Sequence, residues 1–365
     1  MSIFSVPVQP DWPGLLQCLR RQGRSAALPR RVHVIELFLD AEVKDAITAR
    51  FGLARDLDRA APDWAWRREI ELQRFLGYDY VRCGVDAFAM PFHHGTASDT
   101  ADMTRPAGRS FVDEQRGPIT TWEEFERYPW PDPATFTTRA LEFYERNLPD
   151  DMCVIGSGGF AHFAEHLTWL LGYETLCYAL FEQRNLLQSI VAKLLEQNRA
   201  MLRAMLQFSR VKIIWGADDM GFRSGTLVSP EDLRVLVLPG HQEMAAGAHA
   251  AGRPYVLHSC GLIDAIMEDL IDVVKIDAKH SFEDTIETVE AFQDRYGGRV
   301  AVLGGIDVDF LCRADEAQVR QRVRKTLAHC LPRGGYCLGT GNSVANYIPL
   351  DNYLAMLDEG RRFLA

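Results

Sequence analysis

The sequence predicts an α/β protein with a (β/α)8 TIM-barrel architecture, and two observations support this fold class. Short apolar runs alternate with longer helical stretches along most of the 365 residues. The runs are apolar throughout, which is typical of parallel strands that helices cover on both faces. Eight such runs favour a closed barrel. The alternative is a doubly wound open sheet, and the absence of a G-x-G-x-x-G motif after any strand weakens it.

The predicted elements fill the chain in a regular order. The eight strands are expected at 32–38, 80–85, 153–157, 212–216, 255–258, 273–276, 300–303 and 336–338. Helices are expected from Asp40 onward and near 63–76, 161–182, 185–208, 229–251, 262–270, 282–296, 315–330 and 350–363. Residues 1–30 form an irregular or partly helical lead-in to a single catalytic domain at 31–365. The Pro-, Gly-, Asp- and Thr-rich segment 86–135 is expected to be an insertion with a small hairpin that acts as a lid.

Composition excludes several classes of protein. The net charge of −10 is spread along the chain, which argues against a nucleic-acid-binding surface. No apolar run approaches 18 residues, and the N-terminus lacks the charged and apolar regions of a signal peptide. The eight cysteines are too few for a disulfide framework in a chain of this length. We therefore expect a soluble cytoplasmic protein with reduced thiols.

The pair His258 and Cys260 is the best single indication of function. Both residues end the apolar run Tyr255-Val256-Leu257, and a spacing of two on an extended segment points both side chains to one side. Imidazole nitrogen and thiolate sulfur are good ligands for zinc. The alternative is a buried histidine beside an inert cysteine.

Further metal ligands must come from other strand ends, because catalytic zinc takes three protein ligands and leaves one position open. Cys337 on the last predicted strand is the candidate third ligand; the alternative is a small apolar residue of the barrel wall. The candidates for the fourth coordination position are Glu165, Asp218 or Asp219, and a substrate thiol or hydroxyl. Along an extended segment, Asp218 and Asp219 point in opposite directions, so we expect one of them to face the site.

Polar residues follow several predicted strands, and in a barrel these ends converge on one mouth. This set comprises Asp218, Asp219, Asp277, His280, Asp307 and Asn342. Asp307 is equally well explained as a helix N-cap. The glycine-rich segment 339–343 lacks the lysine of a phosphate-binding loop, but Gly339 and Gly341 would let a ligand approach the backbone. We assign Gly339, Gly341 and Asp307 to cofactor binding, and Asp218, Asp219, His280 and Asn342 to catalysis.

A second motif, His162-Phe163-Ala164-Glu165-His166, matches the H-x-x-E-H pattern of some zinc peptidases. The pattern is short and occurs by chance. A role for Glu165 at the barrel mouth is the better interpretation.

In combination these motifs resemble the uroporphyrinogen decarboxylase superfamily. The resemblance rests on segments within 210–360: Asp218-Asp219, 229–231, 249–252, 258–261, 302–307, 335–336, 341–344 and 349–353. It implies a TIM barrel. Decarboxylases of the superfamily are metal-free and grip substrate carboxylates with an arginine-rich N-terminal segment, whereas 31–38 is apolar and acidic here.

The chain looks closer to the corrinoid- and zinc-dependent methyltransferases of this superfamily, whose H-x-C motif matches His258 and Cys260. Their third ligand is a downstream cysteine, and Asn342 occupies that place here. The resemblance implies methyl transfer between a small substrate, here a methoxylated aromatic, and a cobalamin on a separate protein, because the chain has no D-x-H-x-x-G corrinoid motif. The alternatives are a metal-free decarboxylase or lyase with Asp218 or Asp219 as acid or base, and a non-catalytic barrel that binds a tetrapyrrole or corrinoid.

Overall fold

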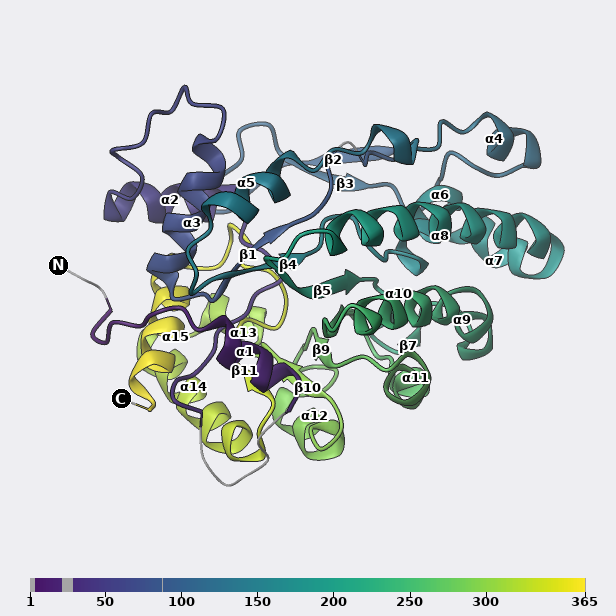
Figure 1. Cartoon of the computed structure of the whole chain (residues 1–365). Helices are drawn as coiled ribbons and strands as arrows, with labels where there is room; N and C mark the ends of the chain where they lie inside the picture. Colours follow the sequence, from purple (N-terminus) through teal and green to yellow (C-terminus); the bar gives the residue numbers. More distant parts are fainter. Residues whose placement is uncertain (1–3, 22–28, 87, 365) are drawn as a thin grey trace.

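A curved sheet of seven parallel strands forms the centre of the protein, which we describe from a computed structural model of residues 4–21, 29–86 and 88–364 (Figure 1). The strand order is β1-β4-β5-β8-β9-β10-β11, so the strands neighbour one another in the order of the chain. Their bounds are β1 Tyr80–Cys83, β4 Cys153–Gly156, β5 Val211–Ala217, β8 Tyr255–His258, β9 Ala278–His280, β10 Ala301–Leu303 and β11 Tyr336–Cys337. The α/β fold with a barrel-like parallel sheet is confirmed.

The first predicted strand, 32–38, lies beside β11 without forming a full strand. Isolated parallel bridges join Val34 to Leu338 and Leu39 to Val344. On its other side the segment contacts β1 through a side chain: the Glu36 N–H donates to the Tyr80 hydroxyl over 2.8 Å. The barrel therefore has a seam between segment 32–39 and β1, because no backbone pairing joins the two among the described residues.

Helices cover the outside of the sheet, and both termini lie on the same side of the molecule (Figure 1). The helices are α1 Trp12–Leu19, α2 Ala41–Phe51, α3 Trp64–Leu76, α4 Trp122–Arg127, α5 Arg139–Asn147, α6 Ala164–Leu171, α7 Tyr173–Glu182, α8 Arg184–Leu206, α9 Pro230–Leu236, α10 Leu238–Ala250, α11 Asp264–Asp269, α12 Val289–Tyr296, α13 Val308–Arg313, α14 Glu316–Cys330 and α15 Leu350–Arg362. Short turns occupy η1 Pro133–Thr135, η2 Leu270–Val274 (a π-helical turn) and η3 Leu331–Arg333. No helix among the described residues is long and apolar enough to cross a bilayer.

Two predicted helices are each split in two. Gly172, with φ 79°, separates α6 from α7, because this left-handed conformation cannot continue a helix. The predicted helix 229–251 breaks at Val237 into α9 and α10, and Pro239 follows as an early residue of the second. Of the lead-in 1–30, the described part contains α1, and residues 1–3 and 22–28 lie outside the described residues.

The predicted strand at 273–276 is wrong. Residues up to Val274 form the π-helical turn η2, and the strand β9 begins at Ala278. A short apolar run does not distinguish a buried helical turn from a strand, which explains the error. Consequently Asp277 precedes β9 rather than following a strand, and its carboxylate accepts hydrogen bonds from His249 Nε2 and the Tyr255 N–H, away from the mouth.

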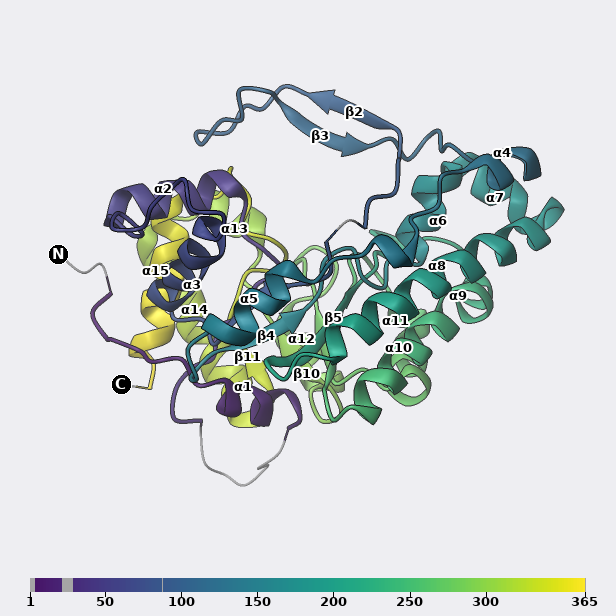
Figure 2. The same ribbon diagram turned by 45° about the horizontal axis from the view of Figure 1, so that its top comes forward.

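The insertion contains the expected hairpin. Strands β2 (His94–Ala97) and β3 (Arg109–Val112) pair antiparallel and stand off the body of the molecule (Figure 2). Arg109 at the start of β3 donates to the Asn346 side chain over 2.6 Å, which ties the hairpin to the loop after β11. A second short hairpin, β6 (Gly221–Phe222) with β7 (Gly225–Thr226), follows β5. The lid role of the insertion stays a prediction.

Candidate metal centre

Strand pairing places His258 at the mouth of the barrel. In the register of the sheet, His258 of β8 is the partner of Ala217 of β5 and of His280 of β9. Beyond the strands the ladder continues, because the Asp218 N–H donates to the His258 carbonyl over 2.9 Å. The carboxyl end of β5 and the residues after β8 therefore meet at one point.

Three side chains converge at that point. His258 Nε2 lies 3.3 Å from Cys260 Sγ and 3.5 Å from Asp219 Oδ1. The donor atoms of Asp219, His258 and Cys260 all lie within 4.8 Å of one another, and within the described part of the chain this is the group that has the geometry of a metal site. The Asp219 carboxylate also accepts from the Cys260 N–H over 2.9 Å, which fixes the loop that carries the thiol.

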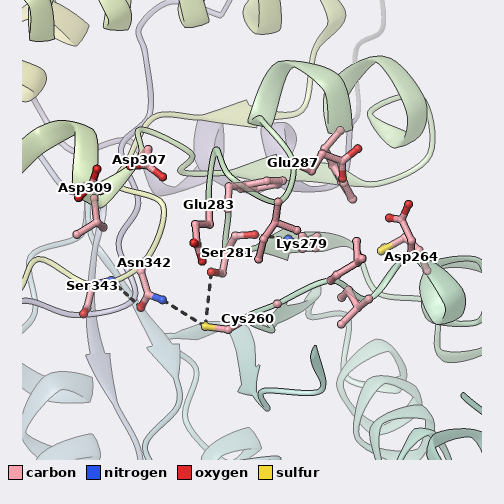
Figure 3. Close-up of a pocket in the computed structure, with 18 of the residues that line it drawn as sticks. Cys260, Asp264, Lys279, Ser281, Glu283, Glu287, Asp307, Asp309, Asn342 and Ser343 are labelled. Carbon is pink, nitrogen blue, oxygen red and sulfur yellow. Dashed lines mark hydrogen bonds between the residues drawn. The ribbon is translucent and has the colours of Figure 1, made fainter. Parts of the chain in front are cut away.

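Hydrogen bonds orient the two soft donors. His258 Nδ1 lies 2.7 Å from His280 Nδ1, so one of these ring nitrogens donates to the other. Cys260 Sγ accepts from the Asn342 side-chain amide over 3.2 Å and lies 3.7 Å from the Ser281 hydroxyl (Figure 3). In this arrangement His258 keeps Nε2 free for a ligand whenever its Nδ1 carries the proton.

Electrostatics at the group depend on burial and on mutual contacts. Burial lowers the pKa of His258, against the opposing effect of Asp219, and burial raises the pKa of the Cys260 thiol well above its usual range. Burial also acts to raise the pKa of Asp219, but the hydrogen bonds from His258 and the Cys260 N–H outweigh it and lower that pKa to about 2. At neutral pH the group thus offers a carboxylate, a neutral imidazole and a protonated thiol, which a divalent cation would deprotonate.

Asp218 has a different task from its neighbour. It is fully buried, and its carboxylate accepts from the N–H groups of Ala164 and Glu165 at the start of α6, each over 2.9 Å. It also lies 2.8 Å from His241 Nε2, whose other ring nitrogen contacts the Tyr255 hydroxyl. Asp218 therefore holds α6 and α10 onto the barrel, while Asp219 faces the site.

The structure does not bring Glu165 or Cys337 into the donor group. Glu165 Oε2 lies 2.5 Å from His162 Nδ1, and burial raises the pKa of this carboxyl to about 7. Cys337 is fully buried, and its sulfur lies 3.6 Å from Cys18 Sγ of α1 on the outside of β11. Cys337 is thus a packing residue of the barrel wall, which was the alternative reading of the sequence.

His166 packs away from the centre. Its buried ring lies against Phe92 and stacks on His162, with centroids 5.4 Å apart in both contacts. The H-x-x-E-H pattern therefore does not bring its two histidines and a third ligand to one point among the described residues.

The residues assigned to cofactor binding have structural tasks. A Cβ on Gly339 would lie 1.9 Å from the Ile35 carbonyl oxygen, and one on Gly341 would lie 2.1 Å from that of Phe282. At both glycines it is thus a neighbouring stretch of backbone, and not a ligand, that comes close to the Cα atom. The Asp307 carboxylate caps α13 through the Phe310 N–H and also accepts from the Asp284 N–H, yet it remains in the wall of the cavity described next.

A cavity of about 310 Å³ adjoins the donor group at Cys260 (Figure 3). This volume falls at the lower end of the range for small-molecule sites. Asn342, Asp307, Lys279 and Phe292 are among the residues that line it. Cys260 thus lies where a small molecule in the cavity would meet the donor group.

The sequence interpretation missed Lys279 and Arg82. Lys279 is 6% exposed, donates to the Ser281 carbonyl and lies 4.0 Å from the Phe282 ring centroid, and burial lowers its pKa to about 8. Arg82 lies on β1 with its guanidinium 4.3 Å above the Trp215 ring. For Arg82, a charged residue inside the apolar run 80–85 was the available signal. Lys279 lies between Asp277 and His280 in a polar stretch, which offers no such signal.

The fold and the site together define a class: a parallel α/β barrel whose mouth carries an aspartate, a histidine and a cysteine that can hold one metal ion. The chain belongs to the uroporphyrinogen decarboxylase (URO-D) family, whose model matches residues 62–363. Among solved structures, a methyltransferase from Methanosarcina mazei is similar, with a TM-score of 0.68 and 17% sequence identity over 96% of this chain and 98% of that protein. At this identity the likeness shows a shared fold. A comparison with curated proteins finds no match.

Proposed function

We propose that the protein is a zinc-dependent methyltransferase that moves a methyl group between a methoxylated aromatic compound and a corrinoid on a separate protein. One observation carries the proposal: the donor atoms of Asp219, His258 and Cys260 lie within 4.8 Å of one another beside a cavity. The family match and the fold shared with a methyltransferase support it.

The donor set fits zinc. A carboxylate oxygen, an imidazole nitrogen and a thiolate sulfur are the usual protein ligands of this ion, and three of them leave one position for a substrate. Asn342, at the place where the resembling methyltransferases carry a third sulfur ligand, donates a hydrogen bond to Cys260 Sγ instead. A carboxylate is a harder ligand than a thiolate, so an Asp-His-Cys set suits an oxygen substrate better than a second sulfur would.

The reaction breaks the bond between the ether oxygen and the methyl carbon, and the methyl group leaves as a cation equivalent toward cobalt(I). The phenolate that remains must be stabilised and finally protonated. Zinc bound at the site would supply a Lewis acid for that oxygen. The chain's own residues then have clear tasks.

Asp219 orients the thiol loop through the Cys260 N–H, and His280 sets the tautomer of His258. Phe282 and Phe292 line the cavity and exclude water from the reacting atoms. Lys279 Nζ, in the same wall, carries a proton at neutral pH that the phenolate can accept.

Zinc analysis of the purified protein tests the proposal first. We expect about one zinc per chain, lost in His258→Ala and Cys260→Ala and retained in the control Cys177→Ser, which changes a partly exposed thiol of α7. A screen of methoxylated aromatics with cobalt(I) cobalamin should then show methyl-cobalt absorbance with the wild type and not with the zinc-free variants. Zinc-free protein that is fully active would refute the proposal.

Metal-independent decarboxylation is a second candidate function, because the family is named after a decarboxylase. The same assay separates the two, because a decarboxylase would release carbon dioxide without zinc and without cobalamin. In that case Asp219, the carboxylate that faces the mouth, would be the acid or base, and Asp219→Asn would abolish activity in zinc-free buffer.

A further inference from the structure

A second cavity of about 310 Å³ lies at the seam between segment 32–39 and β1, and we call it the seam cavity. Helices α2, α3 and α5 complete its wall, and α2 and α3 lie together on one side of the barrel in both views (Figures 1 and 2). It shares no lining residue with the cavity beside Cys260. Its aromatic side chains are Phe38, Trp66, Tyr78, Tyr80 and Tyr144.

Most of the ionisable groups in the seam cavity are already neutralised. Lys44 Nζ donates to both carboxylate oxygens of Glu69, over 2.8 and 2.9 Å, so this pair has no net charge. Glu36 accepts hydrogen bonds from the Thr340 N–H and hydroxyl. Burial nevertheless raises the pKa of Glu36 to about 8, so it is mostly protonated at pH 7.

Arg82 is the exception. Its guanidinium donates to the Glu36 carbonyl over 3.3 Å and lies over the Trp215 ring, but no carboxylate of the described residues lies within 4.0 Å of it. Burial lowers its pKa to about 10, which leaves it protonated at neutral pH. The seam cavity therefore holds one cation without a counterion, in a chain whose net charge is −10.

A partly desolvated cation without a counterion is costly to the folded state, and an anion that enters the cavity removes that cost. A guanidinium presents two parallel N–H groups that match a carboxylate. The single positive charge suits a monoanion better than a phosphate dianion. The aromatic walls favour a flat ring, and the volume suits a small molecule.

We propose that the seam cavity is a binding site for a small aromatic carboxylate, with the carboxylate on Arg82 and the ring between Trp66, Tyr80 and Tyr144. The site is separate from the Asp219-His258-Cys260 group, so the proposal does not require methyl transfer. It lies close to that group all the same, because the Trp215 ring beneath Arg82 contacts His280, with centroids 5.5 Å apart, and His280 contacts His258.

Calorimetric titration with benzoate tests the site, with benzyl alcohol as the uncharged probe of similar shape. We expect the wild type to bind benzoate more tightly than benzyl alcohol. Arg82→Met should weaken benzoate binding roughly 10- to 100-fold and leave benzyl alcohol nearly unchanged, because only the anion loses a charge-assisted hydrogen bond. The benzoate affinity of Arg82→Lys should lie between those of the wild type and Arg82→Met, since lysine keeps the positive charge but lacks the two parallel N–H groups of a guanidinium.

Two controls make the result decisive. Arg203→Met removes an exposed arginine from α8 and should leave benzoate binding unchanged. Lys279→Met removes the cation of the other cavity and should also leave it unchanged. Loss of benzoate binding in Lys279→Met but not in Arg82→Met would overturn the proposal, as would equal affinity of the wild type for benzoate and benzyl alcohol.

Thermal unfolding separates a binding role of Arg82 from a structural one. Because Arg82 is a partly buried charge without a counterion, Arg82→Met should unfold at a temperature no lower than the wild type. Saturating benzoate should raise the unfolding temperature of the wild type and not that of Arg82→Met. A large drop in stability for Arg82→Met without ligand would mark Arg82 as a structural residue and refute the proposal.

Discussion

Replacing His280 tests whether the second-layer contact to His258 controls metal affinity. His280→Phe keeps a ring of similar size against Trp215 but removes the nitrogen that lies 2.7 Å from His258 Nδ1. When Nε2 of His258 binds a metal, Nδ1 carries the proton and must donate it. In His280→Phe this buried N–H has no acceptor at that position.

The expected size of the effect follows from that lost hydrogen bond. An unsatisfied buried donor costs roughly 1–3 kcal/mol. Outer-layer partners of ligating histidines typically change metal affinity by about 10- to 100-fold, which corresponds to about 1.4–2.8 kcal/mol. The two estimates agree, so we expect the zinc dissociation constant of His280→Phe to rise by one to two orders of magnitude.

A chelator competition assay measures this constant directly. His280→Gln is the matched variant, because its side-chain carbonyl can accept the same proton, and its zinc affinity should stay near that of the wild type. Circular dichroism checks that both variants fold. If His280→Phe binds zinc as tightly as the wild type, His280 does not set the tautomer of His258, and the geometry of the centre has been misread.

Three further substitutions probe the mouth of the barrel. Asn342→Cys should tighten zinc binding by about tenfold or more in the same competition assay, because it adds a sulfur donor beside Cys260; an unchanged constant would show that position 342 does not reach the ion. Asp218→Ala should lower the free energy of unfolding by about 3–5 kcal/mol in urea titrations, since it removes the buried partner of His241 and of the α6 N-terminus, and a loss below 1 kcal/mol would contradict that role. Lys279→Met should remove a pH dependence of stability. Folding lowers the pKa of Lys279 from 10.5 to about 8, so between these pH values the unfolded chain binds one proton more than the folded protein. The stability of the wild type therefore rises with pH over this range, by up to about 3 kcal/mol. Equal slopes for wild type and Lys279→Met between pH 8 and 10.5 would refute the assignment.

Periodicity and composition were sufficient for the fold class. Runs that are apolar throughout occur where parallel strands are buried on both faces, and seven of the eight predicted positions hold β1, β4, β5, β8, β10, β11 or the bridged segment 32–39. The failure at 273–276 arose because a partly buried π-helical turn has the same short apolar run as a strand. Local spacing also placed His258 and Cys260 side by side, since that depends only on the alternation of side chains along an extended segment.

Contacts between segments that lie far apart in the chain could not be predicted from the sequence. The choice between Asp218 and Asp219 depends on the rotation of the chain after β5, which turns one carboxylate to α6 and the other to His258. Cys337 faces Cys18 of α1 because of the register of β11, and Asn342 reaches Cys260 across 82 residues. Whether Arg82 has a counterion depends on all the elements packed around it. The sequence does not show which carboxylates lie near its guanidinium, because tertiary packing alone decides that.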